Sequence, residues 1–112
     1  MPIEVRPATS FADVATMLGP KKSPDASVCW CLSHRVDSRT NRSLTGRDRG
    51  EYVRGLVGRT VPPGVLAYDH DGDGDGVCGW AGIAPRADLP VARSTKITAY
   101  DDQPVWNIFC VR

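Results

Sequence analysis

The stretch Val105–Arg112, VWNIFCVR, is the longest nearly unbroken apolar run of the chain, and Asn107 is its only polar residue before Arg112. Valine, isoleucine, phenylalanine and tryptophan favour the extended conformation of a strand. A strand that is apolar on both faces is normally buried on both faces. The stretch therefore predicts a central strand of a sheet, which needs a neighbouring strand on each side.

Two more strands are predicted ahead of it, Val65–Tyr68 and Val77–Ile83, on either side of the sequence DHDGDGDG. Glycine and aspartate tolerate turn conformations, so the two strands form an antiparallel hairpin. The segment from Asp71 to Gly76 also matches the first half of a calcium-binding EF-hand loop. The twelfth position of such a loop requires glutamate but is Gly82 here, and a strand follows where a helix is needed. We therefore interpret the segment as an acidic hairpin tip.

The region before the hairpin begins with a short strand, Ile3–Arg6, and continues into a helix. Apolar side chains recur at i, i+3, i+4 and i+7 from Phe11 to Leu18, which is the stripe of a surface helix. Thr9 or Ser10 caps its start, and a glycine followed by a proline ends it.

A second helix is predicted from Gly46 or Arg47 to about Val57. Gly50 and Gly55 each cost about 1 kcal/mol relative to alanine inside a helix, so this helix needs tertiary packing or a ligand. The preceding stretch Asp37–Thr45 is polar and rich in arginine, and we expect it to be mobile.

The predicted order is strand, helix, helix, strand, strand and buried strand, with a short additional strand at Ile97–Tyr100 after the loop Pro85–Thr98. This order indicates one domain over residues 1–112 of the α/β (α+β) class. We expect a mostly antiparallel sheet with two N-terminal helices that ends in its central strand.

Composition narrows the functional classes only modestly. The chain has 112 residues, is 41% hydrophobic and carries a formal net charge of +1. No apolar run approaches the roughly 20 residues that span a bilayer, and the N-terminus does not resemble a secretory signal. We therefore expect a cytoplasmic protein without a membrane partner, whose cysteines, Cys29, Cys31, Cys78 and Cys110, are reduced thiols.

The segment from His34 to Arg59 contains seven arginines but only three acidic residues. Such a segment is either a solvated face or an anion-binding site. Arginines interleaved with aromatic residues can also hold nucleic acid, but no nucleic-acid-binding module is recognisable, so we expect no such partner. A zinc site from Cys29, Cys31, His34 and Cys78 would lack the usual C-x(2–4)-C pairs, so we expect no metal.

Three segments resemble the first half of the N-acetyltransferases of the GNAT superfamily: GVLAYD (64–69), VCGWAGIAPR (77–86) and VWNIFCVR (105–112). Within them, Gly79-Trp80 followed by Pro85-Arg86 is similar to the hairpin pattern G-W-x-x-x-x-P-R. The last segment is similar to W-x-I-x-C-x-x-V of the central strand. The segment around Trp30 adds to the resemblance, which covers most of the chain and is carried by structural rather than catalytic motifs.

The resemblance implies a partial acetyltransferase fold and transfer of an acetyl group from acetyl-CoA to a primary amine of a small molecule or peptide. It implies that the backbone of Phe109, Cys110 and Val111 pairs with the pantetheine arm. Asn107 would orient a water molecule for catalysis. The acceptor would lie among side chains of the helical region and the hairpin, namely Trp30, His34, Tyr52 and Trp80.

The family motif R/Q-x-x-G-x-G/A, which binds the pyrophosphate of acetyl-CoA at a helix N-terminus, does not occur in this sequence. We therefore expect this truncated chain to be inactive alone. Whether it is a fragment, a truncated reading frame or a subunit is left open, and a C-terminal half could complete it through the last strand. The alternative is a non-catalytic module that forms a homodimer through the edge of that strand.

Overall fold

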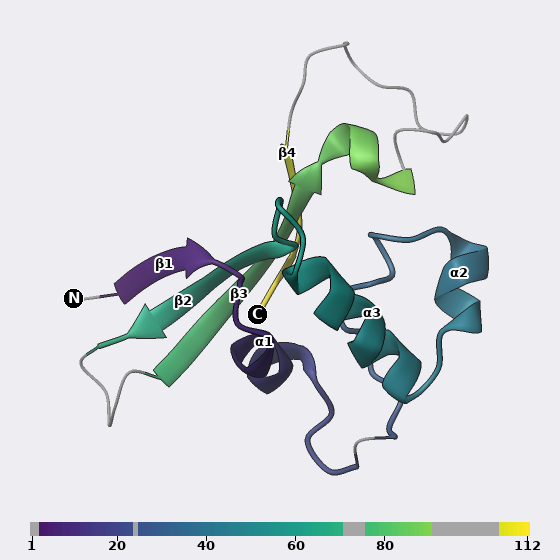
Figure 1. Ribbon diagram of the computed structural model, residues 1–112, viewed down its shortest axis with the longest axis horizontal. Helices are drawn as coiled ribbons and strands as arrows, with labels where there is room; N and C mark the ends of the chain where they lie inside the picture. The colour runs from purple at the N-terminus through teal and green to yellow at the C-terminus, as the bar shows by residue number, and fades with distance from the viewer. Residues whose placement is uncertain (1–2, 24, 71–75, 91–105) are drawn as a thin grey trace.

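The structure is a computed structural model that describes residues 3–23, 25–70, 76–90 and 106–112. Its described elements form an α+β arrangement of four strands, three α-helices and one 3₁₀ turn (Figure 1). In chain order they are β1 (Ile3–Pro7), α1 (Phe11–Leu18), α2 (Ser38–Ser43), α3 (Arg47–Val57), β2 (Gly64–Asp69), β3 (Gly76–Pro85), η1 (Arg86–Asp88) and β4 (Trp106–Val111). The hairpin tip 71–75 and the predicted strand 97–100 lie outside the described residues.

The strands form one sheet in the order β1-β2-β3-β4, and every neighbouring pair is antiparallel. The predicted hairpin is confirmed as β2 and β3, and the predicted first strand as β1. The register shifts between Ala67 and Tyr68 and again between Gly82 and Ile83. These irregularities bend strands locally. The expected mostly antiparallel sheet is therefore present, while the finer assignment to an acetyltransferase fold stays a prediction.

Helix α1 begins and ends where its sequence indicates. Ser10 is the N-cap, and its hydroxyl accepts a hydrogen bond from the backbone N–H of Asp13 at 3.3 Å. Val14 and Leu18, on the predicted apolar stripe, are buried. At the other end, the N–H of Gly19 donates to the carbonyl oxygen of Ala15. Capping at both ends thus limits the helix to two turns.

The sequence analysis predicted no helix at 37–45, but the structure contains the short helix α2 there. The carboxylate of Asp37 caps it by accepting from the N–H of Thr40 at 2.8 Å. Arg49 of α3 then anchors α2, because its guanidinium donates to the carbonyl oxygens of Asn41 and Leu44, both at 2.9 Å. A capped turn with a buried cationic anchor persists even though none of its own side chains is buried.

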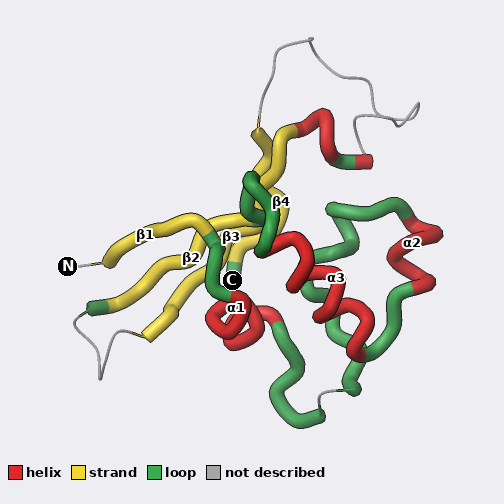
Figure 2. Tube along the Cα trace, in the orientation of Figure 1, coloured by secondary structure: helices red, strands yellow, loops and turns green. Residues whose placement is uncertain are grey.

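The core lies between one face of the sheet and the helices α1 and α3. Helix α2 lies beside α3, on the side away from the sheet (Figure 2). Leu66, Tyr68 and Trp80 contribute from the strands. Buried side chains of the helices and of the segment before α2 meet them; they include Val14, Leu18, Leu32, Val53 and Leu56. Burial of this apolar area is the main favourable contribution to the fold.

The prediction of a central strand buried on both faces is wrong for the last strand. Among the described residues β4 pairs only with β3, so it lies at the edge of the sheet. The side chains of Trp106, Ile108 and Val111 are 55%, 69% and 73% exposed. Trp106 is therefore not a core residue, unlike Trp80. Apolar residues on both faces of a strand indicate two covered faces, but the described helices cover only one face of this sheet.

The prediction of four reduced thiols is also wrong in the structure, because Cys31 and Cys110 form a disulfide. Their α-carbons are 6.3 Å apart, although 79 positions separate the two residues in the chain. The bridge joins the turn after α1 to the edge strand β4. Cys29 and Cys78 are free and exposed.

Candidate functional site

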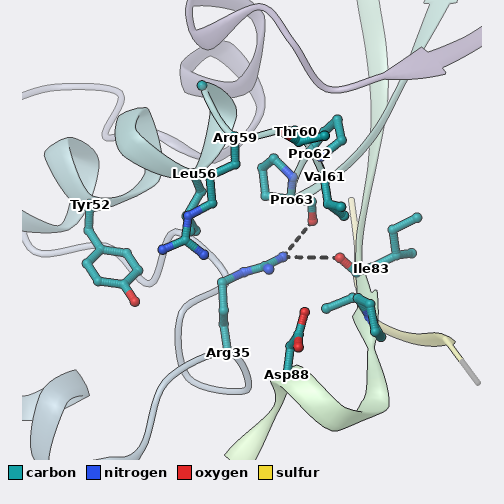
Figure 3. Close-up of a pocket in the computed structure, with 13 residues that line it drawn as sticks. Arg35, Tyr52, Leu56, Arg59, Thr60, Val61, Pro62, Pro63, Ile83 and Asp88 are labelled. Carbon is teal, nitrogen blue, oxygen red and sulfur yellow. Dashed lines mark hydrogen bonds between the residues drawn. The ribbon is translucent and has the colours of Figure 1, made fainter. Parts of the chain in front are cut away.

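A pocket of about 600 Å³ lies where the end of α3 meets the end of β3 (Figure 3). Its wall consists of Tyr52 and Leu56 of α3, the segment 58–63 and the segment 83–85 of β3, together with Arg35 and Asp88. These residues are widely separated in the sequence, so the pocket exists only because the helical layer packs against the sheet. Its size is in the range of pockets that accept small molecules.

The turn that leads from α3 into β2 shapes one side of the pocket. The N–H of Ile83 donates to the carbonyl oxygen of Pro63 at 3.1 Å, which fastens this turn to β3. Gly64 follows, and a β-carbon there would lie only 2.3 Å from the carbonyl oxygen of Ala81 and 2.8 Å from the ring of Trp80. Only glycine permits this close approach, so the sequence Pro-Pro-Gly places the turn against the sheet.

Arg35 is the cation that the fold holds most firmly in this pocket. Its Nη2 donates to the carbonyl oxygen of Pro63 at 2.5 Å and lies 3.5 Å from that of Ile83 (Figure 3). Its guanidinium carbon lies 4.8 Å from the ring centroid of Phe109, which is a cation–π contact. Backbone from the turn before β2 and from β3, together with an aromatic ring from β4, therefore fixes the guanidinium.

Three more ionisable side chains line the same space. Figure 3 shows Arg59 between Tyr52 and Arg35, and the carboxylate of Asp88 directed toward Arg35 from the side of η1. No ion pair within 4 Å joins Asp88 to either arginine among the described residues. The pocket thus contains two cations, one carboxylate and one phenol.

The electrostatic environment of Arg35 follows from this arrangement. Burial lowers the pKa of its guanidinium from the usual value, because desolvation disfavours the charged form. An ionised Tyr52 opposes this change in the pKa of Arg35, and the positive charge of Arg59 adds to it. Arginine nevertheless stays protonated in proteins at neutral pH, so the pocket keeps a partly buried positive charge.

A smaller hollow of about 260 Å³ lies between α1 and α3 and is lined by Trp30, Phe11 and Arg54 among others. The ring of Trp30 stacks on that of Phe11, with centroids 5.8 Å apart. Trp30 and Cys31 both have left-handed backbone angles, φ 54° and 58°. This tight turn directs the indole into the gap between the helices.

The predicted acceptor residues do not gather at one place. Tyr52 lines the pocket of Arg35, whereas Trp30 lines the hollow between α1 and α3. Trp80 is 4% exposed and belongs to the core. His34 is exposed, and its ring centroid lies 6.3 Å from that of Phe109. Their role in acceptor binding remains a prediction, for which Tyr52 has the most suitable position.

The predicted cofactor and catalytic positions all lie on β4. Arg112 and Trp80 exchange two backbone hydrogen bonds, at 2.9 and 3.1 Å. Bonded and non-bonded pairs alternate in an antiparallel ladder, so the backbone of Cys110 faces β3 while that of Val111 faces the free edge. Phe109 follows at the register shift. Asn107 is half-buried and pairs with Ala84 of the pocket wall.

Sequence reasoning did not single out Arg35, Arg59 or Asp88. The arginine-rich segment 34–59 was the available signal, because it suggested an anion site. However, spacing in the sequence could not distinguish an arginine that is buried within the fold from one that lines a pocket. Arg49 from the same segment is buried, and Nη2 donates to the carbonyl oxygen of Cys29 and to Oδ1 of Asn41. The hydrogen bonds of Arg49 are thus made within the fold, whereas Arg35 and Arg59 line a pocket.

Comparisons with protein-family models, with curated proteins and with solved structures find no match to this chain. Within the described ranges, no group of three His, Cys, Asp or Glu side chains is placed to hold a metal ion. No helix in the described part of the chain is long and apolar enough to cross a membrane. Function must therefore be argued from the site itself.

Proposed function

We propose that this protein contributes to acetyl-CoA-dependent transfer of an acetyl group to a primary amine, as the resemblance to the GNAT superfamily implies. The observation that carries the proposal is the edge of β4 that no described strand covers, beside a pocket of about 600 Å³. An extended ligand can pair with an exposed strand edge as an additional strand. The pantetheine arm of acetyl-CoA has amide groups suited to this pairing, and a cytoplasmic location would supply the cofactor.

Each of the predicted site residues on β4, and Tyr52 of α3, would have a separate role. The backbone groups of Val111 at the free edge would bind the pantetheine arm, with Phe109 and Cys110 forming the adjoining part of β4. Tyr52 would contact the acceptor in the pocket. The amine must lose a proton before it attacks the acetyl carbonyl, and a water molecule oriented by Asn107 would pass that proton to the solvent. The C–S bond of the thioester then breaks and CoA leaves as its thiol.

The first experiment is a calorimetric titration of the 112-residue chain with acetyl-CoA. We expect saturable binding that Val111→Pro weakens about tenfold, the effect of removing an interaction worth about 1.4 kcal/mol. Proline removes the N–H that faces the free edge and leaves the pairing with β3 intact. Val111→Thr keeps this N–H and the strand propensity, so it serves as the matched control.

Equal affinities of the proline and threonine variants, or no saturable binding at millimolar acetyl-CoA, would contradict the proposal. Little or no turnover is expected from these 112 residues, because none of them forms the R/Q-x-x-G-x-G/A motif. An assay of amine acetylation with free-thiol detection checks this second expectation. Rapid turnover would show that the pyrophosphate contacts come from other residues.

The alternative function, a module that self-associates through β4, is favoured by a separate observation. Trp106, Ile108 and Val111 are more than half exposed on this edge strand. Exposed apolar edge strands are templates for pairing with another chain. Sedimentation equilibrium distinguishes the two functions: a stable dimer that does not bind acetyl-CoA supports the module, whereas a monomer that binds it supports the transferase.

A further inference from the structure

We propose that the pocket of Arg35 and Arg59 binds an oxyanion, so that the amine acceptor is one that also carries a carboxylate or a phosphate. Among the described residues, cationic side chains outnumber anionic ones in the lining of the pocket. Two guanidinium groups from distant segments line one space, and Asp88 is the only carboxylate among the described residues that line it. An oxyanion between the arginines would compensate the remaining positive charge.

Arg35 retains hydrogen-bonding capacity for such a ligand. A guanidinium has five N–H donors. In the described structure, the two acceptors within reach of Arg35 both lie at Nη2. By contrast, Nη1 and Nη2 of Arg49 each have two acceptors within the fold. The fork of Arg35 is thus positioned by backbone and by Phe109 but is not saturated, which is the condition for binding a planar oxyanion.

The electrostatics favour the same class of ligand. Arg35 is partly removed from water, and Arg59 lies close enough to affect its pKa as a like charge. Arg59 is exposed, so it is mainly the charge of Arg35 that is partly desolvated, and an opposite charge beside it would offset this unfavourable burial. The phenol of Tyr52 adds a neutral donor at the same wall. Asp88 of η1 points toward Arg35 (Figure 3), and its carboxylate can attract the ammonium group of a zwitterionic ligand.

The substrate class rests on the proposed transferase function, but the oxyanion site does not. The test therefore uses no acetyl-CoA. If the oxyanion fails to bind while acetyl-CoA binds, only this inference fails; if the oxyanion binds and acetyl-CoA does not, the proposed reaction fails and the anion site stands.

The probes share an amine and differ in the acid. Calorimetric or NMR titrations of the full chain at low ionic strength compare β-alanine, O-phosphoethanolamine and ethanolamine. We expect saturable binding of the carboxylate or the phosphate probe and at least tenfold weaker binding of ethanolamine. The stronger of the two acidic probes identifies which oxyanion the pocket prefers.

Variants connect the binding to the pocket. Arg59→Ala should weaken binding of the preferred probe at least tenfold, and Arg35→Lys should weaken it at constant charge, because lysine lacks the planar fork. Arg42→Ala, which removes an exposed arginine of α2 outside the pocket, is the matched control and should change affinity less than twofold. Equal binding of ethanolamine, or equal losses in the Arg59 and Arg42 variants, would overturn the inference.

Discussion

At the scale of single residues, Tyr68 shows how a buried polar group constrains stability. Its hydroxyl donates to Oδ2 of Asp13 at 2.7 Å, which joins β2 to α1. Burial raises the pKa of Tyr68 above its usual value of 10, and the hydrogen bond to Asp13 and the charge of that carboxylate raise it further. We expect Tyr68→Phe to lower the free energy of unfolding by about 1 kcal/mol at pH 7.

The raised pKa also fixes the sign of a pH dependence. Above pH 10 the unfolded tyrosine loses its proton before the folded one does, so the unfolded state binds fewer protons and stability falls as pH rises. Urea unfolding of the wild type and of Tyr68→Phe should show that the free energy of unfolding falls between pH 8 and pH 11, and that it falls less in Tyr68→Phe. Tyr52→Phe, which changes a half-buried tyrosine at the pocket, is the control; an equal pH effect in both variants would contradict the assignment.

At the scale of elements, the two glycines of α3 have opposite roles despite their similar place in the sequence. A β-carbon at Gly50 would lie 3.0 Å from Cζ2 of the buried Trp30, whereas one at Gly55 would meet nothing within 4 Å. We expect Gly50→Ala to destabilise the protein by about 1–3 kcal/mol through overpacking. Gly55→Ala should stabilise it by about 0.5–1 kcal/mol, because alanine restricts the unfolded chain and favours the helix.

Urea denaturation of the two alanine variants and the wild type provides the measurement, with each variant serving as the control for the other. A loss of stability in Gly55→Ala would mean that this position is more crowded than the packing indicates. Stabilisation by Gly50→Ala would mean that Trp30 does not occupy the gap between α1 and α3.

The elements that local patterns specify were predictable from the sequence. Apolar positions placed α1 and α3 within a residue or so, caps marked the ends of α1, and the turn sequence placed the hairpin of β2 and β3. Helix α2 was missed because it has no buried face, and its anchor, Arg49, lies in another helix. The edge position of β4 was missed because the number of neighbours a strand has is a property of the sheet. Likewise, no local pattern brings Arg35 and Arg59 to one pocket.

At the scale of the whole molecule, the Cys31–Cys110 disulfide joins the segment before α2 to the last strand of the sheet. It links β4, which pairs only with β3 in the described residues, to the turn that carries Trp30. A bridge that closes a loop of 79 positions restricts the unfolded chain, which corresponds to a stabilisation on the order of 4 kcal/mol in the chain-entropy treatment.

We therefore expect Cys110→Ser, or reduction by dithiothreitol, to lower the free energy of unfolding by up to about 4 kcal/mol, since losing the bridge frees the edge strand. Cys29→Ser and Cys78→Ser change free, exposed thiols and should leave stability within about 0.5 kcal/mol. Thiol titration of the denatured, unreduced protein should detect two thiols, because the other two of the four cysteines are bonded. Detection of four would instead support reduced thiols, and β4 would then be held by its pairing with β3 and by its apolar contacts.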